Sequence, residues 1–141
     1  MGKERMLVQL LDPDPILRDD PVRPSIPWDV RVNHYRCVFA WVEKRKLDAI
    51  CCVSFQSNIP TKEKDLFEDI YGHLHFIMYS IWSYKKGAAS KLVRSVRMLQ
   101  RGKRIITLSP KTEMAANFHK KNGAKVLRTN RTTINYEYKN L

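Results

Sequence analysis

The sequence contains no long hydrophobic run. No apolar stretch approaches the roughly 20 residues that a membrane-spanning helix needs. The apolar stretch at residues 6–11 is too short for a secretory signal and contains Gln9, and the Met-Gly start lacks the Ser or Thr of a myristoylation signal. We therefore expect a cytoplasmic protein with no membrane partner.

Cysteine is also scarce. Cys37, Cys51 and Cys52 are odd in number, and the last two are adjacent, so they do not suggest a disulfide framework. A reduced cysteine usually behaves as a small buried apolar side chain. We expect that behaviour for all three, in preference to a redox or metal role.

Acidic residues are nearly absent from the second half of the chain. Residues 76–141 carry 15 Lys and Arg against only Glu113 and Glu137, so the net charge of +12 comes entirely from this half. Such a basic half indicates an anionic partner or a solubility surface, and charge alone does not choose between them.

What the sequence does contain is enough apolar material for one folded domain. Its 141 residues are 43% hydrophobic, which predicts a single domain over residues 1–141 with a real core. Five of the seven prolines lie within residues 12–33. Because proline removes backbone donors and biases the preceding residue away from helix, we expect this segment, the proline-rich wrap, to be extended or turn-rich.

The apolar pattern predicts a mixed α/β fold. Residues 36–42 and 49–55 are apolar on both alternating faces, so they fit central strands that are covered on two sides. The other predicted strands are residues 6–11, 73–82, 104–108, 124–128 and 132–138.

Three helices are predicted between these strands. A short one falls within residues 61–70, and a longer one follows Gly87 and ends at Gly102. The third is predicted to start with Ser109 as its N-cap and Pro110 as its first helical residue. Its predicted inner side consists of Met114, Ala115 and Phe118.

The most informative stretch is residues 79–92, Y-S-I-W-S-Y-K-K-G-A-A-S-K-L. It reads as a strand that runs through a small basic turn into a helix, whose first amides lack intrahelical partners and favour phosphate. Gly87 allows close approach of a ligand, and Lys85 and Lys86 add positive charge. The alternative is a plain strand-to-helix turn with solvated lysines.

This turn resembles the phosphate loop of the GCN5-related N-acetyltransferase (GNAT) superfamily. That loop reads (Arg or Gln)-x-x-Gly-x-(Gly or Ala) between a strand and a helix, and Y-K-K-G-A-A places Gly87 and Ala89 in register. Tyr84 occupies the position of the Arg or Gln.

A second stretch strengthens the resemblance. The family's next strand commonly runs into N-P-x-N-x-x-A-x-x-L-Y-E-K-x-G-F, and S-P-K-T-E-M-A-A-N-F-H-K-K-N-G-A aligns with it without a gap. His119 falls where the family often has the tyrosine that protonates the leaving thiolate. The chain also resembles small uncharacterised GNAT-like proteins of tailed phages. The residues identical to the GNAT family pattern in this second stretch are Pro110, Ala115, Lys121 and Gly123.

The resemblance implies a GNAT-like mixed central sheet of six to seven strands, splayed between its central strands, with helices on both faces. The proline-rich wrap at residues 12–33 would replace the family's first helices. The implied activity is transfer of acetyl from the cosubstrate acetyl-CoA to an unidentified amine on a small molecule or protein, with no metal. The implied acetyl-CoA-binding residues are Ile81, Trp82, Ser83, Lys85, Lys86, Gly87, Ala88, Ala89, Ser90, Ser109 and Thr112.

Candidate catalytic residues are fewer. His119 is the candidate acid, because an unperturbed imidazole titrates near pH 6.5, although a histidine midway along a helix is more often partly exposed. Tyr136, and with it Tyr138, is an alternative donor, although tyrosines on such a strand more often pack in the core or at its rim. His75 is a candidate base, and it shares one face of its predicted strand with His73. The two histidines could be metal ligands, but no third ligand lies at a recognisable spacing. Further possible bases are Glu68 and Asp69.

A second hypothesis uses the basic half differently. A non-catalytic GNAT-fold module could bind nucleic acid or a virion protein assembly through the lysines and arginines on and near the predicted helix after Gly87. No helix-turn-helix, zinc-finger or RNA-recognition signature accompanies them. If the protein is phage-encoded, the expected location becomes the host cytoplasm or the virion.

Overall fold

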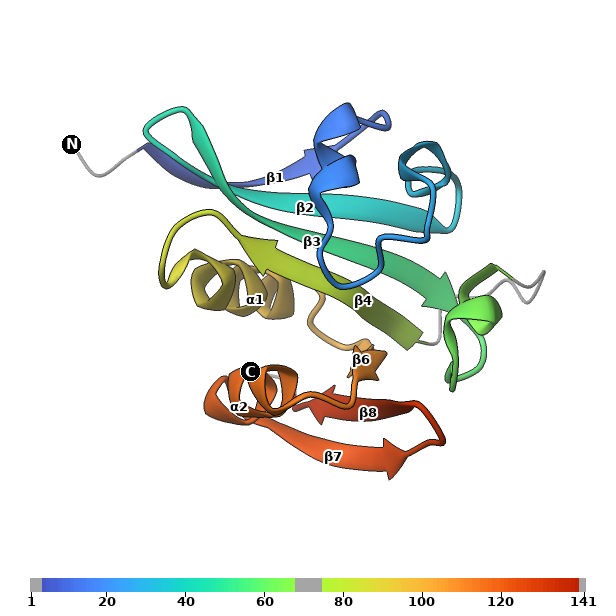
Figure 1. The fold of residues 1–141 in the computed structure, drawn as a ribbon. Coiled ribbons are helices and arrows are strands. Elements are labelled where there is room, and N and C mark those ends of the chain that lie inside the picture. The colour runs from blue at the N-terminus through green and yellow to red at the C-terminus, as the bar shows by residue number, and fades with distance from the viewer. Residues whose placement is uncertain (1–3, 68–74, 140–141) are drawn as a thin grey trace.

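The structure is a computed structural model that describes residues 4–67 and 75–139. These residues form a mixed sheet of eight strands with the order β1-β2-β3-β4-β5-β8-β6, and β7 lies beside β8 (Figure 1). The strands are β1 (Arg5–Leu10), β2 (Arg36–Glu43), β3 (Lys46–Gln56), β4 (His75–Ser83), β5 (Arg104–Thr107), β6 (Ser109–Pro110), β7 (Ala124–Thr129) and β8 (Thr133–Tyr138). The α-helices are α1 (Ala88–Leu99) and α2 (Glu113–Lys121).

Strands β1 to β4 are consecutive antiparallel neighbours. The hairpin between β2 and β3 turns at Lys44 and Arg45, which both have positive φ, as tight hairpins with right-handed strand twist require. Most of β2 and β3 is buried, as their apolar runs predict. The three cysteines lie on these two strands, buried and unpaired, as expected.

The sheet splays open between β4 and β5. The two strands run parallel and pair from His75 with Arg104 to Met78 with Thr107, and a last hydrogen bond of 3.0 Å joins the Leu108 amide to the Met78 carbonyl. Beyond it the chain turns into β6 and pairs with β8. Within the described part of the chain, residues 80–83 therefore pair with β3 alone, and Tyr79 lies at the register shift between these two strands. This geometry matches the splay that the family resemblance implied.

Helical segments cover both faces of the sheet (Figure 1). On one face, α1 buries Leu92, Val93 and Val96 against β2, β3 and β4, and Phe118 of α2 packs against the same apolar cluster. On the other face lie three 3-10 helices, η2 (Pro15–Asp19), η3 (Trp28–Val30) and η4 (Glu63–Phe67), which contribute Leu17 and Leu66 to a second cluster.

A buried ion pair stabilises the proline-rich wrap. The Arg31 guanidinium is almost fully buried, and its Nη1 binds the Asp20 carboxylate. Its Nη2 donates to the carbonyls of Arg23 and Ile26, both at 2.9 Å. Arg23 in turn donates to the Leu108 carbonyl at 3.0 Å, which attaches the wrap to the chain at the splay. The wrap contains η2 and η3 and no α-helix.

The predicted start of the third helix is wrong. Ser109 and Pro110 form β6, because they pair with Ile134 and Thr133 of β8. The N-cap is Thr112, whose Oγ1 accepts a hydrogen bond of 3.2 Å from the Ala115 amide.

Two other helix predictions need correction. Met114, predicted on the inner side of the third helix, is 83% exposed. The short helix predicted within residues 61–70 is the 3-10 helix η4, and residues 68–70 lie outside the described part. Among residues 4–67 and 75–139, the helices are all too short or too polar to cross a membrane.

Candidate functional site

A cleft of about 360 Å³ lies where β4 and β5 separate. The edge of β4 that faces away from β3 forms one wall, and α2 together with β6 forms another. Because no strand of residues 4–67 or 75–139 covers that edge, its backbone groups are open to an extended ligand. The lining residues are Pro21, Val22, Met78, Tyr79, Ser80, Ile81, Trp82, Ser83, Ala89, Leu108, Ser109, Pro110, Thr112, Met114, Ala115, Phe118 and His119.

The turn into α1 lies at one end of this cleft. Gly87 is the N-cap of α1 and has a left-handed φ of 84°, while a Cβ added there would meet nothing within 4 Å. The position therefore requires glycine for its backbone conformation and not for space.

The amides of this turn are free to bind an anion. Within residues 4–67 and 75–139, the amides of Gly87, Ala89 and Ser90 have no hydrogen-bond acceptor. They sit at the positive end of the α1 dipole. Ala89 also lines the cleft, so the amides and the cleft form one continuous surface.

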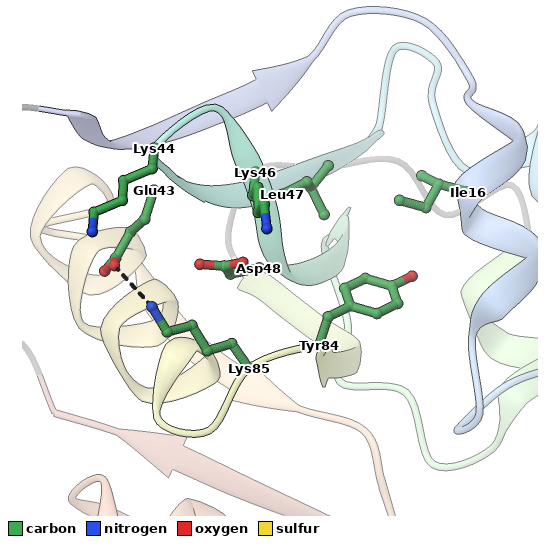
Figure 2. Close-up of a pocket in the computed structure, with 8 residues that line it drawn as sticks. All are labelled: Ile16, Glu43, Lys44, Lys46, Leu47, Asp48, Tyr84 and Lys85. Carbon is green, nitrogen blue, oxygen red and sulfur yellow. Dashed lines mark ion pairs between the residues drawn. The ribbon is translucent and has the colours of Figure 1, made fainter.

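One lysine of the turn, Lys85, lies close to a carboxylate. Figure 2 shows the Glu43 carboxylate at the end of β2 pointing toward Lys85, with 3.7 Å between Glu43 Oε2 and Lys85 Nζ. Glu43 Oε1 also accepts from Lys91 Nζ at 2.9 Å and from Trp41 Nε1 at 3.0 Å. The bonds from Trp41 and Lys91 lower the pKa of Glu43 to about 2. Part of the positive charge of the turn is therefore already paired within the protein.

Tyr84, at the position of the family's Arg or Gln, connects the turn to the wrap. Its hydroxyl donates to Asp19 Oδ2 at 2.8 Å and accepts from Trp82 Nε1 at 3.0 Å. The Tyr84 ring lines the open hollow of Figure 2 between the β2–β3 hairpin and η2. Tyr84 therefore links the end of β4 to the wrap, at a position where the family motif has a side chain with amide or guanidinium donors.

His119 is buried, which the sequence did not predict. It lines the cleft and is only 6% exposed. Its Nδ1 lies 2.7 Å from the Tyr138 hydroxyl, and its ring stacks on Tyr136 with centroids 5.1 Å apart. Burial lowers the pKa of His119 to about 4. At neutral pH the His119 imidazole therefore holds almost none of the protonated form that an ordinary histidine, from which an acid role was inferred, still populates.

The cleft brings together seven of the predicted acetyl-CoA-binding or catalytic residues: Ile81, Trp82, Ser83, Ala89, Ser109, Thr112 and His119. Five more lie at its end, in the turn and in the first residues of α1: Lys85, Lys86, Gly87, Ala88 and Ser90. The sequence did not predict that Pro21 and Val22 of the wrap line the cleft, because nothing in a proline-rich segment indicates which part of the protein it will contact.

Two of the predicted catalytic residues lie outside the cleft. Tyr136 is buried beneath His119 and does not line the cavity. His75 is at the opposite end of β4, next to Arg104 of β5, and burial together with that arginine lowers its pKa. His73, Glu68 and Asp69 lie outside the described residues. Across residues 4–67 and 75–139, no group of three or more His, Cys, Asp or Glu side chains could hold a metal ion.

The chain resembles known proteins in its three-dimensional structure and not in its sequence. No protein-family model and no curated protein sequence matches this chain. The PaiA N-acetyltransferase of Thermoplasma acidophilum, solved with coenzyme A, has a TM-score of 0.54 at 12% identity, over 74% of this chain and 61% of that protein. NAA60 of Arabidopsis thaliana, solved with a bisubstrate analogue, has a TM-score of 0.55 at 13% identity, over 94% and 95% of the two chains.

A third similar structure comes from a larger enzyme. The malonyl-CoA decarboxylase of Agrobacterium vitis has a TM-score of 0.64 at 19% identity, over 82% of this chain and 36% of that protein. This chain thus spans about three fifths of the PaiA protein and about one third of the decarboxylase. At identities this low, the structural similarity establishes a shared fold and nothing more.

Proposed function

We propose that this chain, which has the fold of the GNAT N-acetyltransferases, binds acetyl-CoA and transfers its acetyl group to a primary amine. The observation that carries the proposal is the continuous surface that runs from the uncovered edge of β4 to the free amides at the start of α1. An apolar cleft beside a ready-made anion site suits a ligand with an extended arm and a pyrophosphate.

Two parts of acetyl-CoA have a complementary surface. The pantetheine arm carries amides that can form strand-like hydrogen bonds with β4, along Ile81 to Ser83. The pyrophosphate is placed against the amides of Gly87, Ala89 and Ser90. Because Lys85 is already near Glu43, the backbone is expected to contribute more to phosphate binding than that side chain.

The proposed chemistry follows from this orientation. An uncharged amine attacks the thioester carbonyl, the new C–N bond forms, and the C–S bond breaks with its electron pair passing to sulfur. Backbone donors at the uncovered edge of β4 would polarise the carbonyl. His119 lines the same cleft and is the side chain proposed to face the leaving thiolate. We place neither Tyr136 nor His75 in contact with the reacting atoms.

The solved structures support the choice of ligand. PaiA N-acetyltransferase was solved with coenzyme A and NAA60 with a bisubstrate analogue, and this chain shares their fold. The acceptor amine, on a small molecule or a protein, is open. Pro21 and Val22 of the wrap line the cleft where the family usually has its first helices, so we expect the wrap to help select the acceptor.

Calorimetric titration with acetyl-CoA tests the proposal most simply. Saturable binding is expected, with pantetheine alone binding more weakly because it lacks the pyrophosphate. Absence of binding at millimolar acetyl-CoA would exclude the enzyme hypothesis. If binding is found, a screen of amines with acetyl-CoA labelled in the acetyl group identifies the acceptor.

A second candidate function rests on the surface charge. Lys91, Arg94 and Arg101 are exposed on or just after α1, and Lys125 and Arg128 are exposed on β7. We infer that a non-catalytic role, in binding nucleic acid or a virion assembly, is the alternative. It predicts an affinity for DNA that falls steeply with salt; salt-independent binding, or none, would exclude phosphate tracking.

A further inference from the structure

The hydrogen bond between His119 and Tyr138 constrains the chemistry of the cleft. Both side chains are buried, with 6% and 2% of their surface exposed. They come from α2 and β8, and 2.7 Å separates His119 Nδ1 from the Tyr138 hydroxyl oxygen. Because Nδ1 is occupied, Nε2 is the imidazole nitrogen left for a ligand in the cleft that His119 lines.

The count of donors and acceptors selects one tautomer. Within residues 4–67 and 75–139, the Tyr138 hydroxyl has His119 as its hydrogen-bonding partner. If the phenol donates to Nδ1, the phenolic proton is satisfied and the imidazole proton lies on Nε2. If Nδ1 were protonated and donated instead, the phenolic proton would be buried without an acceptor, which is unfavourable.

The surroundings also keep the pair uncharged. Tyr136 of β8 stacks on the imidazole, and Phe118 of α2 meets it edge-on with centroids 5.2 Å apart. The charged group packed against the pair is Arg97 of α1, whose guanidinium carbon lies 5.0 Å from the Tyr138 ring centroid. Burial of the ring and the nearby Arg97 cation both disfavour an imidazolium.

We propose that Tyr138 is a positioning residue that holds His119 in its Nε2–H tautomer, so that His119 presents a neutral N–H donor to the sulfur end of acetyl-CoA. This inference rests on the proposed function. In the reaction, the electron pair of the broken C–S bond stays on sulfur and is stabilised by the Nε2–H. The imidazole keeps its proton, and the amine proton leaves to solvent. His119 is therefore a hydrogen-bond donor to the thiolate and does not act as a general acid.

The tautomer can be measured without any turnover. Nitrogen-15 chemical shifts of the His119 ring, recorded between pH 5.5 and 8, should show a single Nε2-protonated species. Tyr138→Phe removes the phenol and should produce a mixture of tautomers, while the matched control Tyr35→Phe, just before β2, leaves the signals unchanged. An Nδ1-protonated ring in the unmodified protein, or no change in Tyr138→Phe, would overturn the assignment.

Activity separates a neutral donor from an acid. Glutamine is a neutral N–H donor and leucine is not, so His119→Leu should lower kcat by about 10- to 100-fold at unchanged KM, and His119→Gln should lower it clearly less. Equal losses in both variants would contradict the donor role. Failure of acetyl-CoA to bind would reject the proposed function, yet leave the measured tautomer standing, so the two failures are distinguishable.

Discussion

Replacing Gly87 by glutamate perturbs the turn into α1, the proposed pyrophosphate site, in two separable ways. The first is backbone strain, because a φ of 84° costs a residue with a Cβ about 1–2 kcal/mol. The second is charge. A carboxylate within about 4 Å of one phosphate charge costs about 1 kcal/mol in water and about 4 kcal/mol at the lower effective dielectric of a protein surface. The second effect corresponds to a loss of affinity between about 5-fold and about 1000-fold.

Two other variants isolate these effects. Gly87→Ala has the strain without the charge, and its Cβ meets nothing within 4 Å, so it should lose stability but little affinity. Gly102→Glu has the same kind of strain, at a φ of 89° in open space after α1, and adds its charge away from the cleft. Urea denaturation measures the free energy of unfolding, and calorimetry measures the dissociation constant for acetyl-CoA. If Gly87→Glu binds acetyl-CoA as tightly as Gly102→Glu does, the pyrophosphate does not lie on this turn.

Three further predictions concern stability. Asp20→Ala leaves the Arg31 guanidinium buried without its carboxylate and should cost about 3–5 kcal/mol in urea denaturation; a cost below about 1 kcal/mol would contradict the importance of this pair. The pKa of Glu43 is lowered to about 2, so the stability that its carboxylate contributes is present above pH 4.5 and is lost as the pH falls toward 2. Between these pH values the free energy of unfolding should fall less steeply for Glu43→Gln than for the unmodified protein. Equal pH dependence in the two proteins would refute this role of Glu43. The pKa of His119 is lowered to about 4, so unfolded protein binds the extra proton and stability should fall as the pH drops from 6.5 to 4; His119→Gln should lack this part of the fall, and an identical profile would contradict the burial.

The matched control for Asp20→Ala is the exposed pair of Glu137 and Arg104. The Arg104 guanidinium donates two hydrogen bonds of 2.9 and 3.0 Å to the Glu137 carboxylate, which is a bidentate geometry. Both side chains are partly exposed, so solvent weakens their attraction. Glu137→Ala should cost no more than about 1 kcal/mol.

Much of the fold could be predicted because local patterns and tertiary structure agree. The apolar runs of β2 and β3 are long enough to identify buried strands. Gly87 and the amphipathic stretch after it identify α1. The mixed α/β class and the GNAT-like architecture followed from the order of these elements together with the two resembling stretches.

What could not be predicted depends on contacts between distant residues. Ser109 and Pro110 have the local signature of a helix start, yet pairing with β8 makes them a strand. The burial of His119 depends on β8, whose Tyr136 and Tyr138 enclose the ring. The position of Glu43 beside Lys85 arises only when the β2–β3 hairpin meets the turn into α1.

The central claim is that acetyl-CoA lies along the uncovered edge of β4 with its pyrophosphate on the amides that begin α1. Amide chemical shifts recorded by NMR during a titration with acetyl-CoA test this claim residue by residue. The largest changes should appear at residues 79–83 and at Gly87, Ala89 and Ser90, and pantetheine should reproduce only those of residues 79–83. Unchanged shifts at millimolar acetyl-CoA, or changes confined to other parts of the surface, would contradict the account.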